Sequence, residues 1–171
     1  MAITINGSGI TSSEIADGTI TASDIASGVT GKVLQVVSAT EANEYSTTSS
    51  SWAQNMQLNL SITPASSSNK ILLMSTVEFE VQYANSRGAV DFYRSISGGA
   101  TTYNLTGESQ GLGIITDLGR TPIGLTYLDS PATTSAITYD ISYKWEGGGA
   151  GNVYVGGISN LTTIIAMEIQ G

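Results

Sequence analysis

The sequence predicts an all-β protein: a single jelly-roll-like sandwich of about 8–10 strands, preceded by an extended N-terminal arm. Apolar and polar residues alternate with a period of two in several segments of the 171-residue chain. Clusters of Gly, Ser, Asn and Pro separate these segments. No stretch of ten residues shows the periodicity of a helix. A β-propeller would need a longer chain.

The first half of the predicted sandwich contains three clear strands. KVLQVV at 32–37 is the first, and the polar residues 41–51 read as a loop. Residues 52–62 alternate, with Met, Leu, Leu and Ile on one face. A turn cluster at 64–69 follows, and then 71–83 is the longest predicted strand, with its acidic and Gln side chains on one face and its apolar side chains on the other.

The second half contains shorter strands separated by Gly- and Thr-rich turns. The strand at 137–145 alternates cleanly, and Tyr139, Tyr143 and Trp145 on its apolar face are expected in the core. EGGGAGN at 146–152 can supply the positive φ angles of a hairpin connection. The other predicted strands are 90–96, short segments near 102–105, 112–115 and 123–127, and finally 153–158 and 163–169.

Residues 1–31 differ in kind from the predicted sandwich at 32–171, because they carry a repeat of period ten, ITSSEIADG followed by ITASDIASG. Ordering about 30 residues costs on the order of 30–60 kcal/mol of backbone entropy. Burying six isoleucines returns only roughly 12–18 kcal/mol. We therefore expect this arm to become ordered only against symmetry mates or a partner, a disordered tail being the alternative. The expected docking residues of the arm are Ile3, Ile5, Ile10, Ile15, Ile20 and Ile25.

Composition excludes several classes of function. The formal net charge is −8, and the six basic residues are scattered, which argues against a protein that follows nucleic-acid phosphates. No basic amphipathic helix and no apolar run of about 20 residues is present, so we expect neither membrane binding nor insertion. The chain has no Cys and no His, which removes thiolate chemistry, Ser-His-Asp triads and ordinary zinc sites. We expect no cofactor.

Carboxylates are the remaining groups that could support catalysis or bind a metal. Glu78 and Glu80 lie two positions apart on one face of a strand, about 7 Å from each other, as a glycosidase pair requires. A solvated strand face explains this pair better, and we expect no enzyme activity. Four other acids would bind calcium only if loops brought them together, because their spacing is not that of an EF-hand: Asp117, Asp129, Asp140 and Glu146.

Several segments of the chain resemble the C-terminal domains of phage tail fibres and related virion appendages, especially those of phages of aquatic bacteria. These segments are GKVLQVV, NMQLNLSITP, SSSNKILLMSTVEFEV and NLTTIIAMEIQG, and the arm sequence IADGTITASDIASG resembles the repeats that precede such domains. The layout also resembles the trimeric jelly rolls of the tumour-necrosis-factor and complement-head type, which end in an apolar strand near the threefold axis. The residues expected at that axis are Ile165, Met167 and Ile169.

These resemblances imply a homotrimeric virion protein, made in the host cytoplasm and attached through its arm to other virion proteins of the tail, portal or capsid. Three functions stay open: a tail or head fibre, a capsid decoration protein that braces the shell, and a carboxylate enzyme acting on glycans. A fibre would also bind the host surface, where Tyr45, Tyr103 and Tyr127 are candidates for stacking on a host glycan. Half-buried core aromatics are the alternative explanation for these tyrosines.

Overall fold

The computed structural model describes residues 32–171, except 55, 117, 148–150 and 158–159. Within this range, Val33–Gly171 forms one compact unit. The expected boundary between arm and sandwich stays a prediction. The isoleucines expected to dock the arm lie outside the described residues: Ile3, Ile5, Ile10, Ile15, Ile20 and Ile25.

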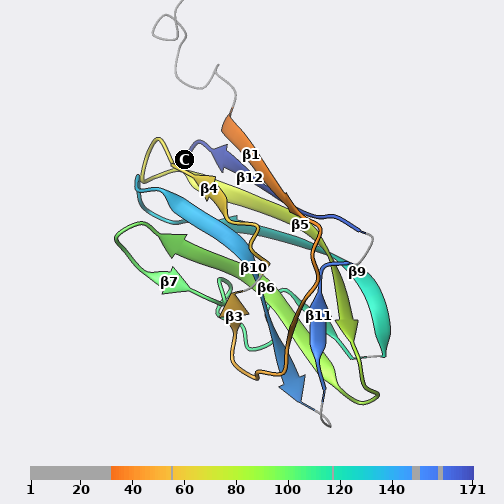
Figure 1. Ribbon diagram of the computed structural model, residues 1–171. Helices are drawn as coiled ribbons and strands as arrows, with labels where there is room; N and C mark the ends of the chain where they lie inside the picture. Colours follow the sequence, from red (N-terminus) through yellow and green to blue (C-terminus); the bar gives the residue numbers. More distant parts are fainter. Residues whose placement is uncertain (1–31, 55, 117, 148–150, 158–159) are drawn as a thin grey trace, which may run out of the picture. The chain divides into compact units, whose positions relative to one another are not determined.

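The described residues form twelve strands and no helix, arranged as two antiparallel sheets packed as a sandwich (Figure 1). The all-β prediction is confirmed, with more than the expected 8–10 strands because several are only two or three residues long. The first sheet has the order β1 (Val33–Glu41), β12 (Thr162–Ile169), β5 (Lys70–Val81), β11 (Val153–Val155) and β2 (Tyr45–Thr47), with β9 (Gly119–Asp129) on the other side of β5. The second has the order β3 (Ala53–Gln54), β10 (Ile137–Gly147), β6 (Arg87–Ile96) and β7 (Thr101–Thr102), with β4 (Leu60–Ile62) on β10 and β8 (Gly113–Ile115) on β6.

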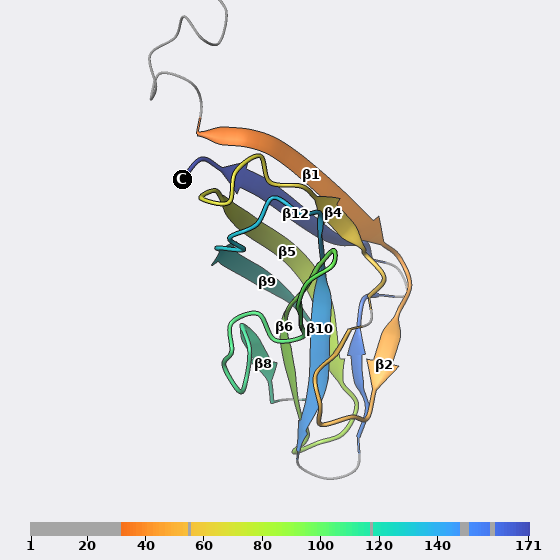
Figure 2. The same cartoon turned by 90° about the vertical axis from the view of Figure 1, so that its left-hand side faces the viewer.

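The path of the chain between the sheets is jelly-roll-like. The first and last described strands, β1 and β12, pair antiparallel, so the two ends of the sandwich sequence meet in one sheet. The chain changes sheet between β5 and β6 and again between β9 and β10. Figure 2 shows β1, β12, β5 and β9 as one curved layer. No helix in the described part of the chain has the length and hydropathy that crossing a membrane requires.

The EGGGAGN segment at 146–152 does not join a hairpin, and this prediction is wrong. β10 pairs with β6 in the second sheet, whereas β11 pairs with β5 and β2 in the first. The segment therefore connects the two layers. Gly147, which has a φ angle of 113°, allows a change of direction at the end of β10, but local turn chemistry does not determine which strands pair afterwards.

Alternation along the strands buries one face of each sheet in a shared core. In β5, the side chains of Leu73, Val77 and Phe79 are fully buried. Tyr139 and Tyr143 of β10 are also fully buried, as expected for the apolar face of this strand. Trp145 is half-buried against the same core.

The predicted continuous strand at 52–62 is wrong, although its apolar residues do enter the core. Gln57 and Asn59 have φ angles of 50° and 45°. This left-handed conformation interrupts the pleat between β3 and β4. The alternate apolar residues of the segment are nevertheless buried: Met56, Leu58, Leu60 and Ile62.

A buried carboxylate, Glu168, holds the turn before β5 against β12 and β1. It accepts hydrogen bonds from the Asn69 side chain at 2.5 Å, the Ala65 backbone at 2.7 Å and the Gln35 side chain at 2.5 Å. Burial alone raises the pKa of Glu168. The hydrogen bonds from Asn69, Gln35 and the backbone of Ala65 and Ser66 outweigh that effect, so the pKa lies below its ordinary value.

Glu168→Gln is expected to lower the free energy of unfolding near neutral pH by about 1–3 kcal/mol, because the amide replaces one acceptor with a donor. Since the folded pKa lies below the ordinary 4.5, this group stabilises the wild type above that pH, and the stabilisation is lost as pH falls through the folded pKa. Urea unfolding at several pH values between about 7 and 3 measures both effects. The variant should lose less stability on acidification, and an equal loss in both proteins would contradict the assignment.

Candidate functional site

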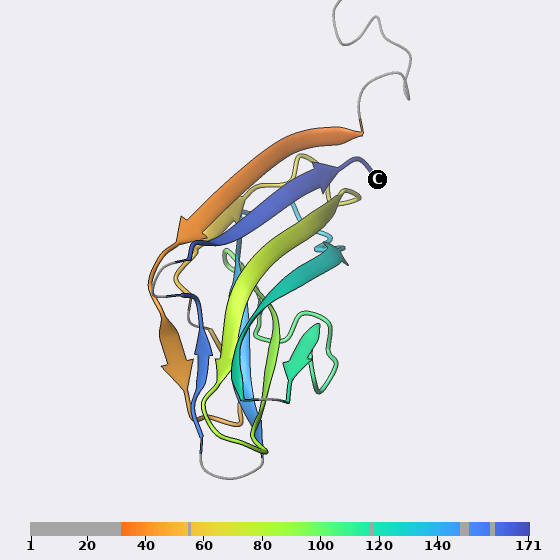
Figure 3. The same ribbon diagram turned by 90° about the vertical axis from the view of Figure 1, so that its right-hand side faces the viewer.

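The outward side of the first sheet carries a row of apolar residues. Side chains alternate across each strand, so residues between the core positions of β5, β9 and β12 point away from the core. The strand register places one apolar residue from each of four strands in a single row: Val36, Met167, Leu72 and Leu128. In the next row Ile165 lies opposite Met74. We call these six residues the apolar face, and Figure 3 shows the four strands side by side.

Much of the apolar face is open to solvent in a single copy. Val36 is 56% exposed, Leu128 47% and Met74 40%. β1 and β9 lie at the two edges of this part of the sheet, three strand spacings or about 14 Å apart. The apolar row therefore extends across the whole width of the layer. Contiguous exposed apolar patches of this kind mark interaction surfaces.

The structure places the residues expected at a trimer axis on this side of the sheet. Ile165, Met167 and Ile169 are all half-buried on the outward side of β12. Their neighbours on the other strands were missed from sequence. The signal for Leu72 and Met74 is the run ILLM at 71–74, where apolar residues occupy both faces of the strand.

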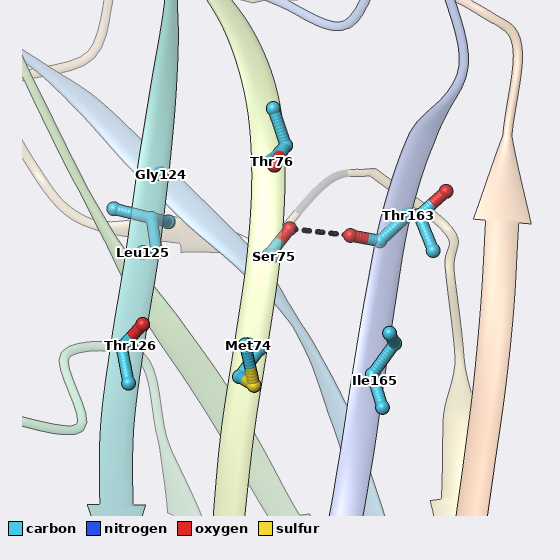
Figure 4. Close-up of a pocket in the computed structure, with 8 residues that line it drawn as sticks. All are labelled: Met74, Ser75, Thr76, Gly124, Leu125, Thr126, Thr163 and Ile165. Atoms are coloured by element: carbon cyan, nitrogen blue, oxygen red, sulfur yellow. Dashed lines mark hydrogen bonds between the residues drawn. The ribbon is translucent and has the colours of Figure 1, made fainter.

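A shallow hollow of about 260 Å³ lies beside the centre of the apolar face (Figure 4). A Cβ atom added at Gly124 would meet no atom within 4 Å, so the missing side chain contributes to the hollow. Met74 and Ile165 line it, together with Thr126 and Thr163. Its size and apolar lining suit an apolar side chain from a second molecule.

Charged residues gather at the other end of β5 and β9, around Arg120. The Arg120 Nε atom lies 2.7 Å from Glu80 Oε2 and 4.0 Å from Glu78 Oε1, and Arg120 Nη2 also contacts Glu44. The hydrogen bond to Glu44 is the main cause that raises the pKa of Arg120. Asn160 donates to Glu78 at 2.8 Å. Glu78 and Glu80 do share one strand face, and there they link β5 to β9 and to the residues before β2.

Of the four acids considered for calcium, the three that the structure describes are not brought together. Asp117 lies outside the described residues. Asp129 is buried on β9, Asp140 is buried on β10, and Glu146 is ion-paired with Lys144. Among the described residues, no group of three or more His, Cys, Asp or Glu side chains is placed to hold a metal ion.

The three tyrosines considered for sugar stacking have different surroundings. Tyr45 and Tyr127 are half-buried and pack against the core. Tyr103 is 45% exposed, and its ring contacts Tyr93 edge to face with centroids 5.2 Å apart. Of the three, Tyr103 presents the most open ring to solvent.

No protein-family model matches this sequence, and no curated protein matches it. Solved structures with a similar arrangement include virus particles. The T13 viral particle of infectious bursal disease virus matches with a TM-score of 0.40 at 14% identity, covering 82% of this chain and 36% of that chain. The Gt strain of the same virus matches with a TM-score of 0.38 at 15% identity, covering 80% and 38%. The VP2 subviral particle of this virus matches with a TM-score of 0.31 at 17% identity, covering 80% and 38%.

The described sandwich thus corresponds to well under half the length of these neighbours.

Proposed function

We propose that this protein is a structural component of a phage virion and works as a homotrimer whose copies pack through the apolar face. The observation that carries the proposal is the apolar row that crosses four strands from Val36 to Leu128. The low content of charged residues, 12% of the chain, agrees with a surface that is partly covered by assembly. The resemblance of the sequence to phage tail-fibre domains supports the virion role.

The resemblance of the layout to trimeric jelly rolls supports a threefold arrangement of the copies. β12 lies between β1 and β5, near the middle of the apolar face. Packing around a threefold axis would bring its outward side chains towards two other copies, as the resemblance to trimeric jelly rolls implies. Each exposed Val, Leu or Met side chain that becomes completely buried between copies stabilises their association by about 1.5–3 kcal/mol.

Light scattering of the full chain at micromolar concentration tests this proposal directly. The expected mass is three times the 17.7 kDa of one chain. A stable monomer would contradict both the trimer and the role given to the apolar face.

Within the virion, we propose an appendage that is attached through its N-terminal arm and has no catalytic role. The alternative is a decoration protein that braces the capsid. Gold-labelled antibody on virions distinguishes the two, since label on tails or fibres supports the appendage and label over the whole shell supports the decoration protein. Tyr103 is the candidate contact for a host glycan, because its ring is the most exposed of the three tyrosines considered.

A chain that begins at Lys32 is expected to stay folded and trimeric but to lose incorporation into particles. The core and the apolar face lie within Val33–Gly171, whereas the isoleucines proposed to dock on the particle lie in residues 1–31. Circular dichroism and light scattering check the fold and the trimer, and immunoblotting of purified virions measures incorporation. Normal incorporation of the shortened chain would show that the sandwich carries the docking surface.

A further inference from the structure

The outward side of the second sheet carries a row of hydroxyl groups. Side chains alternate along each strand, so the residues between the core positions of β4, β10, β6 and β7 point away from the core. The register places one Ser or Thr from each of these four strands in a single row: Ser61, Thr138, Ser95 and Thr101. We call these four residues the hydroxyl row, and Figure 1 shows the strands that carry it. All four are exposed or half-buried, so the row is open to solvent.

An exposed aromatic ring lies beside the hydroxyl row. Tyr103 comes two residues after Thr101, and Tyr93 comes two residues before Ser95, so both tyrosines fall on the outward side. Their rings meet edge to face, with centroids 5.2 Å apart. Tyr93 is 7% exposed, whereas Tyr103 is 45% exposed. Tyr93 therefore supports the Tyr103 ring and leaves much of it accessible to a ligand.

A buried carboxylate holds the segment that follows Tyr103. Asp91 is fully buried. It accepts hydrogen bonds from the hydroxyl of Thr106 and, at 3.4 Å, from the backbone of the same residue. Within the segment, the Asn104 side chain donates to the backbone carbonyl of Glu108 at 2.6 Å. These bonds fix the segment before a ligand arrives, which lowers the entropic cost of binding.

The charges near the hydroxyl row favour an uncharged ligand. Two carboxylates belong to the same side of the sheet, Asp91 on β6 and Asp140 on β10, but both are fully buried. Glu108 is exposed in the segment after Tyr103, and the chain has a formal net charge of −8. An acidic ligand would therefore be repelled, whereas an uncharged one would not.

We propose that the hydroxyl row and Tyr103 together bind an uncharged oligosaccharide. Each Ser or Thr hydroxyl offers one donor and two acceptor positions, which match the hydroxyl groups of a sugar. The ring of Tyr103 offers an apolar surface with a polar tip, which suits the C–H face of a sugar ring. The row crosses three strand spacings, about 14 Å, and can therefore contact more than one sugar unit.

This inference rests on the host-binding role proposed for Tyr103, and it adds the hydroxyl row and the class of glycan to that role. The two outward sides of a sandwich face in opposite directions. The copies are proposed to pack through the apolar face of the first sheet, whereas the hydroxyl row lies on the second. Assembly therefore leaves the row open, and a trimer would present it three times, which raises the avidity for a glycan-coated surface.

An array of uncharged and acidic oligosaccharides, probed with the full chain, tests the proposal. Isothermal titration calorimetry then measures the affinity for the uncharged oligosaccharide that gives the strongest signal. We expect binding to be confined to uncharged oligosaccharides. Binding to none of them, or equally tight binding to acidic ones, would overturn the inference.

Variants locate the binding surface. Tyr103→Ala should weaken binding of the same oligosaccharide at least about tenfold, because the stacking surface is lost. Ser95→Ala/Thr138→Val removes two hydroxyls of the row and should weaken it about tenfold. Tyr83→Ala is the matched control, because Tyr83 is 51% exposed but lies before β6, at the end opposite Ser95. Equal binding by the Tyr103 and Tyr83 variants, or unchanged binding by the double variant, would contradict the proposed surface.

Light scattering of the same samples separates this inference from the proposed assembly. A trimer that binds no uncharged oligosaccharide would overturn the inference and leave the proposed packing through the apolar face intact. A monomer that binds one, with the expected losses in the variants, would support the inference and contradict the proposed trimer.

Discussion

Met167→Asp is expected to convert the trimer into folded monomers at micromolar concentration. Met167 stands in the apolar row between Val36 and Leu72, where a carboxylate would be buried against other copies without a partner. Burying an unpaired charge costs several kcal/mol. The assembly should therefore weaken by at least about 100-fold. Because Met167 is only half-buried in a single copy, the sandwich itself should remain intact. Light scattering measures the mass, and far-ultraviolet circular dichroism measures the fold.

Thr101→Asp is the matched control for this prediction. It adds the same charge at an exposed position on β7 of the second sheet, away from the apolar face, so the trimer should persist. Ile165→Asp should behave like Met167→Asp, since Ile165 lies on the same side of β12. If the Met167→Asp variant remains a trimer, the copies associate through another surface. The same conclusion follows if the Thr101→Asp control dissociates to the same extent as Met167→Asp.

Asp129→Ala is expected to lower the free energy of unfolding by about 3–5 kcal/mol, a large part of the 5–15 kcal/mol typical of a domain. Asp129 on β9 of the first sheet accepts two hydrogen bonds from Arg94 on β6 of the second sheet, at 2.7 and 2.9 Å. The Asp129 side chain is only 5% exposed and that of Arg94 18%. Removing the carboxylate leaves a largely buried guanidinium without its counter-ion. Urea denaturation followed by fluorescence measures the loss.

Tyr139→Phe is the comparison variant for this buried network. The Tyr139 hydroxyl donates to Asp129 at 2.6 Å, and burial, together with the charge of Asp129, raises the pKa of Tyr139, so the hydroxyl keeps its proton at neutral pH. The phenylalanine variant removes one hydrogen bond and keeps the ion pair, so it should cost only about 1 kcal/mol. If Asp129→Ala lowers the free energy of unfolding no more than Tyr139→Phe does, the ion pair between Asp129 and Arg94 does not stabilise the packing of the two sheets.

Strands with a strong local pattern could be predicted from sequence, and short strands could not. The predicted segments 71–83 and 137–145 correspond closely to β5 and β10, because their alternation is visible along the chain itself. β2 lies inside the predicted loop 41–51. Its three residues carry too little pattern to be recognised, and they become a strand because they pair with β11, more than 100 positions later.

The candidate site was only partly predictable for the same reason. Ile165, Met167 and Ile169 could be singled out because β12 is apolar along its length. Val36 and Leu128 could not, because each belongs to a different strand and joins the row only through the register. β12 brings Met167 beside Val36, and β5 brings Leu72 beside Leu128.

By itself, the sequence determined the all-β class, the absence of Cys and His chemistry, and the apolar character of the last strand, since these depend on composition and on neighbours along the chain. Only the tertiary structure decided which strands pair, that EGGGAGN crosses between sheets, and that four strands present one continuous apolar row. The physical reason is that a strand makes no backbone hydrogen bonds within itself and depends on neighbouring strands that local sequence does not specify. The register chosen by that partner then determines which side chains become neighbours on the surface.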